Sequence, residues 1–114
     1  MPKNDQLPPT AVSAGPPCSP SFDRSRYPTD ETCEAVATWN PCDPVGWFEF
    51  VEAAWSDYGR VRRDGWTIDF VTGGWSGNEQ LIGAMHANVA WSLCWESSHR
   101  GGLHRFEIPE NFRK

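Results

Sequence analysis

Two polar segments of the sequence hold the side chains that could bind a ligand. The first, residues 72–79, reads TGGWSGNE, and the second, residues 97–102, reads SSHRGG. Glycines permit positive φ angles and close approach of the backbone, and consecutive amides at the start of a helix can hold an anion. Both segments are therefore candidate anion-binding turns.

The first segment also predicts the start of a helix. Ser76 is followed three residues later by Glu79, which is the spacing of a capping box. In that motif the serine oxygen accepts from one free backbone amide and the glutamate accepts from another. We therefore expect Ser76 to be the N-cap of a helix over residues 78–88.

If the two segments meet, they form a cleft suited to an anionic ligand such as a nucleotide. Trp75 would supply a stacking surface, and Arg100 would supply positive charge. Alternatively, both segments are only tight turns and Glu79 is only a cap, since the first segment lacks the lysine of a phosphate-binding loop. The predicted ligand-binding residues are Gly73, Gly74, Trp75, Ser76, Asn78, Glu79, Ser98, His99 and Arg100.

A metal-dependent hydrolase or nuclease is an alternative function. Asp69, Glu79 and Glu96 could hold a divalent cation, but no lysine follows at nuclease-like spacing. Zinc binding is weakly indicated, because no Cys-x-x-Cys pair accompanies the candidate ligands. Those candidates are Cys33, Cys42, His86, His99 and His104.

Nucleophilic catalysis is also weakly indicated. Ser97 and Ser98 precede His99, but adjacent residues of an extended segment point apart, and no orienting carboxylate is identifiable. We therefore predict no catalytic residue, no metal ligand and no cofactor, and we favour a binding protein over an enzyme.

Length and charge limit the classes of protein that fit. A chain of 114 residues and 12.8 kDa has room for one small domain. The net charge is −5, and nine acidic against three basic side chains lie within residues 1–59. This argues against a broad nucleic-acid-binding surface, which needs clustered Lys and Arg. An acidic helix face that docks on a host protein is a further alternative, carried by Glu49, Glu52 and Asp57.

Cysteine content and hydropathy predict a cytoplasmic protein with reduced thiols. The four cysteines are too sparse for a disulfide-rich secreted scaffold. The sequence contains no signal-peptide pattern and no apolar run of membrane-spanning length. We expect no membrane partner.

The proline-rich residues 1–28 predict a disordered leader, and residues 29–114 predict a single α+β domain. Residues 29–39 favour a short helix. Asp43 is a good N-cap for a helix over residues 44–58, whose apolar side chains recur at helical spacing. That apolar face comprises Trp47, Phe48, Val51, Ala54, Trp55 and Tyr58.

The second half of the chain predicts a sheet of about four strands. Asp64-Gly65 predicts a hairpin between residues 60–63 and 66–71. Alternation of Trp91, Leu93 and Trp95 predicts a strand over residues 89–96, and residues 103–108 complete the order α-β-β-α-β-β. If strands 66–71 and 89–96 are parallel, both polar segments fall at the same sheet edge.

The two motifs, with Cys94-Trp95 between them, resemble a family of small proteins of unknown function encoded in bacteriophage and prophage genomes. The likeness covers roughly residues 46–108 and departs after Gly102, where Leu103 replaces the expected histidine. It implies a phage accessory protein that acts in the cytoplasm of a bacterial host. Binding of an anionic ligand or a host protein, in counter-defence, would suit that setting.

Overall fold

The computed structural model describes residues 19–113, and these form an α+β fold with a four-stranded sheet, as the sequence predicted. Residues 1–18 of the predicted leader lie outside the described part of the chain. The elements in chain order are α1 (Asp30–Thr38), α2 (Pro44–Ala54), β1 (Arg60–Asp64), β2 (Thr67–Val71), α3 (Ser76–His86), α4 (Val89–Cys94), β3 (Trp95–His99), β4 (Leu103–Glu107) and a 3₁₀ turn, η1 (Glu110–Phe112).

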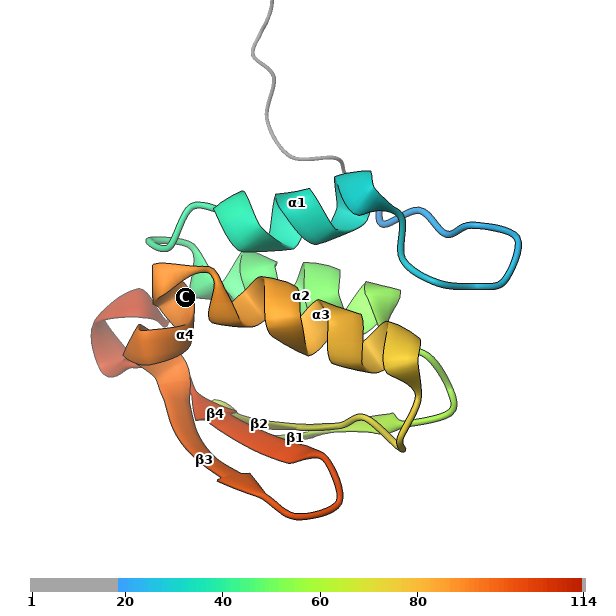
Figure 1. Cartoon of the computed structure of the whole chain (residues 1–114). Coiled ribbons are helices and arrows are strands. Elements are labelled where there is room, and N and C mark those ends of the chain that lie inside the picture. The colour runs from blue at the N-terminus through green and yellow to red at the C-terminus, as the bar shows by residue number, and fades with distance from the viewer. Residues whose placement is uncertain (1–18, 114) are drawn as a thin grey trace, which may run out of the picture.

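The sheet has the order β1-β2-β4-β3, and every neighbouring pair of its strands is antiparallel. The helices cover one face, so the other face is open (Figure 1). Strands β2 and β3 run in the same direction, as the sequence analysis supposed, but they are not neighbours: β4 lies between them and is antiparallel to both. The chain between α3 and β3 forms another helix, and β3 then turns directly into β4, which pairs with β2.

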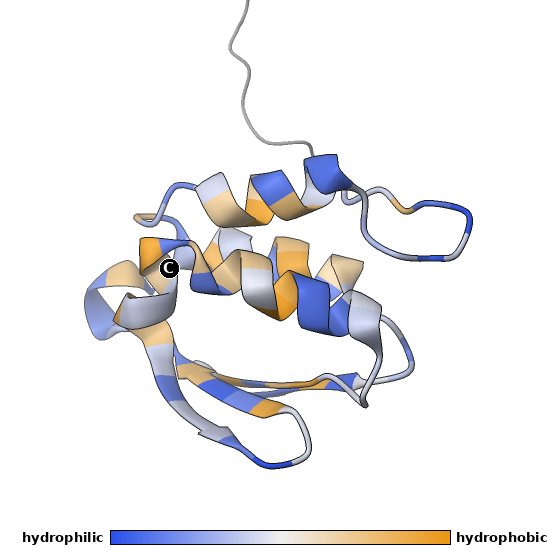
Figure 2. Ribbon diagram, viewed as in Figure 1, coloured by the Kyte–Doolittle hydropathy of each residue, from blue (hydrophilic) through white to orange (hydrophobic). Residues whose placement is uncertain are grey.

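The core lies between the helices and the covered face of the sheet. Phe48 of α2 packs against Phe70 of β2 and Phe106 of β4, with ring centroids 6.0 and 5.2 Å apart. The indole N–H of Trp47 donates to the carbonyl oxygen of Val36 at 2.9 Å and so holds α1 on this core. Figure 2 shows hydrophobic residues of α1 on the side facing the rest of the molecule.

Helix α2 begins as predicted and ends earlier. The Asp43 carboxylate accepts from the amide of Gly46, and Pro44 occupies the first turn. The helix ends at Ala54 instead of residue 58, because tertiary hydrogen bonds hold the following backbone extended. The amide of Ser56 donates to Oδ1 of Asn78, and the indole of Trp55 donates to the carbonyl of Val71.

The hairpin between β1 and β2 has its turn one residue later than predicted. Asp64 pairs with Thr67, which leaves Gly65 and Trp66 in the turn, and Gly65 has a φ of 64°. Alternation along β2 is confirmed, since Ile68 and Phe70 are fully buried on the core side. Asp69, which lies between them, is on the open face.

Residues 89–94 form the helix α4, so the predicted strand over residues 89–96 was wrong. Asn88 decides this conformation. Its Oδ1 accepts from the amide of Ala90, and its Nδ2 donates to the carbonyls of Val36 and Trp39. The period-two pattern was misleading because Leu93 and Trp95, 46% and 45% exposed, are not core residues.

The predicted capping box was also wrong. Helix α3 begins at Ser76, its N-cap is Trp75, and no side chain caps it. The hydroxyl of Ser76 lies 2.9 Å from the hydroxyl of Tyr27, within hydrogen-bond distance. A long-range contact therefore replaces the local cap.

Within residues 19–113, no helix combines the length and the apolar character that crossing a membrane requires.

Candidate functional site

The two polar segments meet at the edge of the sheet where β2 and β3 both end, as expected for strands that run in the same direction. Because β2 and β4 are antiparallel neighbours, Val71 pairs with Leu103, and the amide of Thr72 donates to the carbonyl of Gly102 at 3.0 Å. The end of one strand thus lies beside the start of the other. Gly102, with a φ of 82°, fits closely over the hydroxyl of Thr72.

Trp75 forms the centre of an aromatic stack. Its ring lies 4.8 Å from the ring of Tyr27 and 4.8 Å from that of Tyr58. Three distant parts of the sequence therefore meet here: the loop before α1, the loop after α2 and the glycine turn. These contacts hold the ring of Trp75 in place between the two tyrosine rings.

Asn78 is 1% exposed and links two loops. Its Oδ1 accepts from the amide of Ser56, and its Nδ2 donates to the carbonyl of Thr72. These bonds hold the glycine turn against the segment that follows α2. Asn78 therefore has a structural role whether or not a ligand binds here.

The other predicted site residues point in several directions. Ser98 faces the helix side of the sheet and lies 2.8 Å from Nδ1 of His104. His99 lies on the open face, with its Nε2 3.0 Å from the hydroxyl of Ser97. Arg100 and Glu79 are exposed, on the β3–β4 turn and on α3. A ligand-binding role for the predicted set, including Gly73 and Gly74, stays a prediction.

The open face carries a hollow of about 420 Å³ around Asp69. Arg105 donates to both carboxylate oxygens of Asp69, at 2.8 and 3.1 Å. These hydrogen bonds hold the pKa of Asp69 below its ordinary value, and burial opposes them in part. The lining residues are Arg62, Arg63, Asp64, Thr67, Asp69, Glu96 and Arg105.

The charges that line this hollow balance. It contains three arginines and three carboxylates, and Arg63 also pairs with Glu52 of α2 at 2.9 Å. A free anion would have to compete with Asp69 for the guanidinium of Arg105 and with Glu52 for that of Arg63. The other two carboxylates of the hollow would repel it. The open face is therefore a poor site for an anionic ligand.

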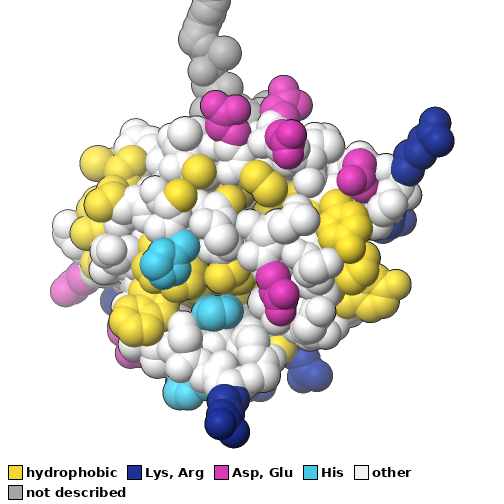
Figure 3. Space-filling view, viewed as in Figure 1, with side chains coloured by type: hydrophobic (Ala, Val, Ile, Leu, Met, Phe, Trp, Pro, Cys, Tyr) yellow, Lys and Arg dark blue, Asp and Glu magenta, His cyan; other side chains and the backbone are white. Residues whose placement is uncertain are grey.

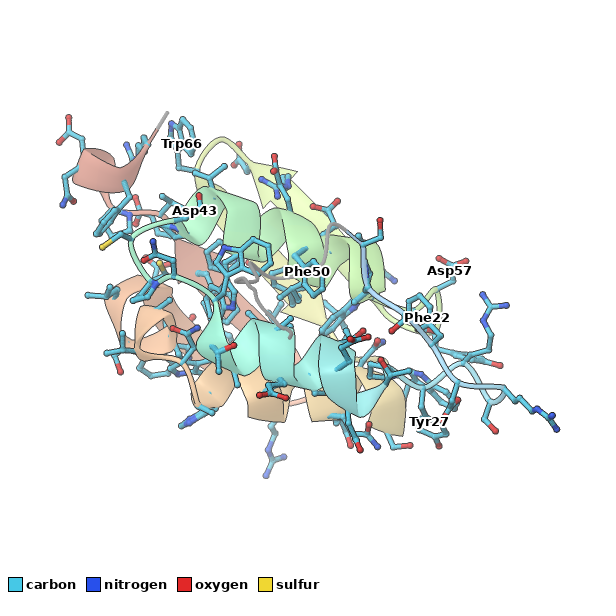
Figure 4. All side chains as sticks on the ribbon, turned by 90° about the horizontal axis from the view of Figure 1, so that it is seen from above. Phe22, Tyr27, Asp43, Phe50, Asp57 and Trp66 are labelled. Carbon is cyan, nitrogen blue, oxygen red and sulfur yellow. The ribbon has the colours of Figure 1, made fainter. Side chains whose placement is uncertain are left out.

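A second hollow, which we term the aromatic pocket, has a volume of about 550 Å³. It lies between the loop before α1 and the segment after α2. Phe22, Tyr27 and Asp57 lie at the same end of the molecule in Figure 4, and Figure 3 shows hydrophobic side chains gathered at this end. Its lining residues are Phe22, Arg26, Ala53, Trp55, Ser56, Asp57 and Tyr58.

Sequence reasoning missed this pocket. Phe22 and Arg26 fall in the predicted leader, and Trp55 and Tyr58 were assigned to the core face of a longer helix. One available signal was the pair of aromatic residues, Phe22 and Tyr27, within an otherwise proline-rich and polar stretch. Such residues indicate contact with the domain, and the structure shows that contact.

The metal alternatives gain no geometric support from residues 19–113. Within this part of the chain, no three His, Cys, Asp or Glu side chains come together as a metal site. Cys33, Cys42 and Cys94 are free thiols. Burial raises the pKa of the Cys94 thiol to about 11, which makes it a poor nucleophile and a poor metal ligand.

Comparison with known proteins adds no family or fold relative: no family model matches the chain, and no curated protein or solved structure matches it significantly.

Proposed function

We propose that the protein binds a small anionic ligand with a planar ring, of the nucleotide class, in the aromatic pocket. The observation that carries this proposal is the pocket's lining, which joins three aromatic rings to the guanidinium of Arg26. A volume of about 550 Å³ lies in the range of small-molecule sites, roughly 300 to 1,000 Å³.

The exposed rings suit a stacking ligand. Phe22 is 43% exposed and Tyr58 is 70% exposed, so both keep ring surface in contact with water. A nucleobase that covers such a ring removes apolar surface from water and gains stacking energy, about 1–3 kcal/mol per base. The ring of Trp55 gives the pocket a third aromatic surface.

The polar groups of the pocket complement the rest of a nucleotide. Arg26 can donate two parallel hydrogen bonds to a phosphate, and the carboxylate of Asp57 can accept from an exocyclic amine. Arg26 has a φ of 71°, which is unusual for a residue with a side chain. Such strain often accompanies a functional position.

The pocket is held in shape without a ligand. Trp75 packs against Tyr58, which lines the pocket, and Tyr27 packs against the other side of Trp75. The loop that carries Arg26 is closed by Asp23, whose Oδ1 accepts from the amides of Ser25 and Tyr27. Preformed walls reduce the entropy that binding must overcome. Trp75 and Ser76 of the predicted site thus support the pocket from behind.

The resemblance to small phage-encoded proteins is the basis for the biological role that we propose for this binding. A binder of nucleotides in the cytoplasm of a bacterial host could sequester a host nucleotide signal and so act in counter-defence. The protein would not need to catalyse a reaction for that purpose.

Calorimetric titration tests the proposal. The purified protein is titrated with AMP, ATP and a cyclic dinucleotide, and with ribose 5-phosphate as a ligand that has the phosphate without the base. We expect one nucleotide to bind at one site and ribose 5-phosphate to bind more weakly. Replacing Arg26 by glutamine should weaken nucleotide binding about tenfold, which is the typical worth of a charge-assisted hydrogen bond.

Arg24→Gln is the matched control, because Arg24 is exposed on the same loop and does not line the pocket. It should leave binding unchanged. Equal losses in the two variants would indicate a general charge effect and would contradict the proposed pocket. Absence of binding to every nucleotide would refute the proposal outright.

A further inference from the structure

Strands β3 and β4 carry two serine–histidine pairs, one on each face of the sheet. On the open face, Ser97 lies 3.0 Å from Nε2 of His99. On the helix side, Ser98 lies 2.8 Å from Nδ1 of His104, its partner across the strands. The second pair receives a further hydrogen bond, from Trp95.

Trp95 donates to the Ser98 oxygen. Its indole N–H, which can only donate, lies 2.8 Å from that hydroxyl oxygen. Ser98 keeps its own hydrogen, which it donates to Nδ1 of His104 when the imidazole carries its proton on Nε2. A serine that donates to histidine is the arrangement in which the histidine can remove the proton.

Neighbouring aromatic rings hold His104 in place. The ring of His104 meets that of Trp91 edge to face at 5.9 Å, and the ring of His86 packs against Trp91 in a tilted arrangement at 4.5 Å. Burial, together with the nearby His86, keeps the pKa of His104 below 6.5. At neutral pH the imidazole is therefore uncharged and can accept a proton.

We propose that Ser98 is a nucleophilic serine, with His104 as its general base, that reacts with activated acyl or phosphoryl esters. This activity is separate from ligand binding in the aromatic pocket. Ser98 is exposed, so an ester can reach it. The half-exposed ring of Trp95 beside it favours a small aromatic or aliphatic acyl group.

The proposed reaction needs only the ester and water as reactants. The Ser98 oxygen forms a bond to the acyl carbon, the bond from that carbon to the leaving oxygen breaks, and the Ser98 proton passes to Nδ1 of His104. The imidazolium then protonates the leaving alkoxide. Water, deprotonated by His104, cleaves the acyl-serine and restores both side chains.

Turnover should be slow, because only part of a full catalytic site is present. Among residues 19–113, no carboxylate forms a hydrogen bond with His104, whose ring is held by packing instead. A serine activated in this way is expected to acylate readily and to deacylate slowly. Covalent labelling is therefore a sharper test than turnover.

The test exposes the full chain to a fluorophosphonate probe and maps the adduct by mass spectrometry of its peptides. In the probe, the phosphorus–fluorine bond breaks as the Ser98 oxygen bonds to phosphorus, and fluoride leaves. We expect one adduct, on Ser98. His104→Gln should slow labelling by about 100-fold, the lower end of what a general base contributes.

Ser97→Ala is the matched control, since it removes the neighbouring hydroxyl and the pair on the opposite face. Its labelling rate should equal that of the wild type, whereas Ser98→Ala should not be labelled. Circular dichroism of each variant checks that the fold is retained. If Ser98→Ala does not fold, the mapped position in the wild type decides the question.

The pH profile separates catalysis from mere exposure. His86 of α3 is the titratable group whose charge acts on His104, and β3 contributes the neutral Ser98. The labelling rate should rise through a pKa below 6.5 and then become constant. An adduct on Ser97, no adduct, or equal rates in wild type and His104→Gln would each overturn the proposal.

Discussion

The side chain of Asn78, at the start of α3, donates to the carbonyl oxygen of Thr72 at 3.1 Å and is almost completely buried. Its Oδ1 accepts from the amide of Ser56, so a single residue joins the end of β2 to the segment after α2. The glycine turn between Thr72 and Asn78 is therefore held at both ends. The wall behind the aromatic pocket depends on this link.

Asn78→Ala should destabilise the protein strongly. It leaves one buried carbonyl and one partly buried amide without a partner, at about 1–3 kcal/mol for each group. We expect the free energy of unfolding to fall by about 2 kcal/mol or more, measured by urea denaturation. Gln80→Ala, on an exposed position of the same helix, is the control and should change it little.

Gly73 and Gly74 should differ in their tolerance of alanine. Both have positive φ, 67° and 76°. A Cβ at Gly73 would overlap the carbonyl oxygen of Tyr58, whereas a Cβ at Gly74 meets nothing. Gly74→Ala should cost about 1–2 kcal/mol, for the left-handed backbone alone, and Gly73→Ala about 3 kcal/mol or more. Equal melting temperatures for the two variants would show that the turn does not pack closely against the backbone of Tyr58 at Gly73.

The ion pair of Asp69 and Arg105 should control unfolding in acid. The hydrogen bonds from Arg105 lower the pKa of Asp69 below 3.8, so the folded state holds its proton less tightly than the unfolded chain. This stabilisation is fully present above pH 3.8 and is lost as the pH falls through the folded-state pKa. Arg105→Gln should therefore move the midpoint of acid unfolding to higher pH, followed by circular dichroism.

Glu107→Gln provides the comparison for this ion pair, because it leaves in place the hydrogen bond from Arg113 to the carbonyl of Ile108. Arg113 pairs with Glu107 at 3.2 Å, but that carboxylate is half exposed. An exposed pair contributes little, so the acid midpoint should hardly change. Equal shifts in the two variants would mean that the hydrogen bonds from Arg105 to Asp69 are not the cause.

Stability in mildly acidic solution, below pH 6.5, should depend on the protonation of His104. Its pKa is lowered in the folded state, first by burial and then by the charge of His86, so unfolding takes up a proton as the pH falls below 6.5. The contribution of His104 to stability is complete above pH 6.5 and is lost as the pH falls towards the folded-state pKa. Urea denaturation over this range should show a smaller pH dependence in His104→Gln than in the wild type.

His99→Gln is the control for the same series, because His99 is exposed on the open face. It should keep the dependence seen in the wild type. If it removes that dependence instead, the titrating group has been misassigned.

Features that depend on short-range interactions were determined by the sequence itself. Asp43 before Pro44 fixes the start of α2, because the carboxylate of Asp43 binds the amide of Gly46, only three residues later. Thr29 caps α1 in the same way. Alternation along β2 places Ile68 and Phe70 in the core, since the period of a strand is a property of the backbone.

Tertiary structure decided where long-range hydrogen bonds and packing compete with local preference. Residues 89–94 alternate like a strand, yet Asn88 donates to the carbonyl of Val36, 52 positions earlier, and caps a helix. Trp55 and Tyr58 continue a helical pattern, yet hydrogen bonds to Val71 and Asn78 end α2 before them.

The candidate site follows the same division. The glycine turn could be predicted from the sequence, because consecutive glycines favour a tight turn with positive φ angles. The aromatic pocket was not visible, since it needs Phe22 and Arg26 of one loop to meet Tyr58 of another. That meeting depends on Trp75, whose ring is held between Tyr27 and Tyr58 by contacts that only the folded chain creates.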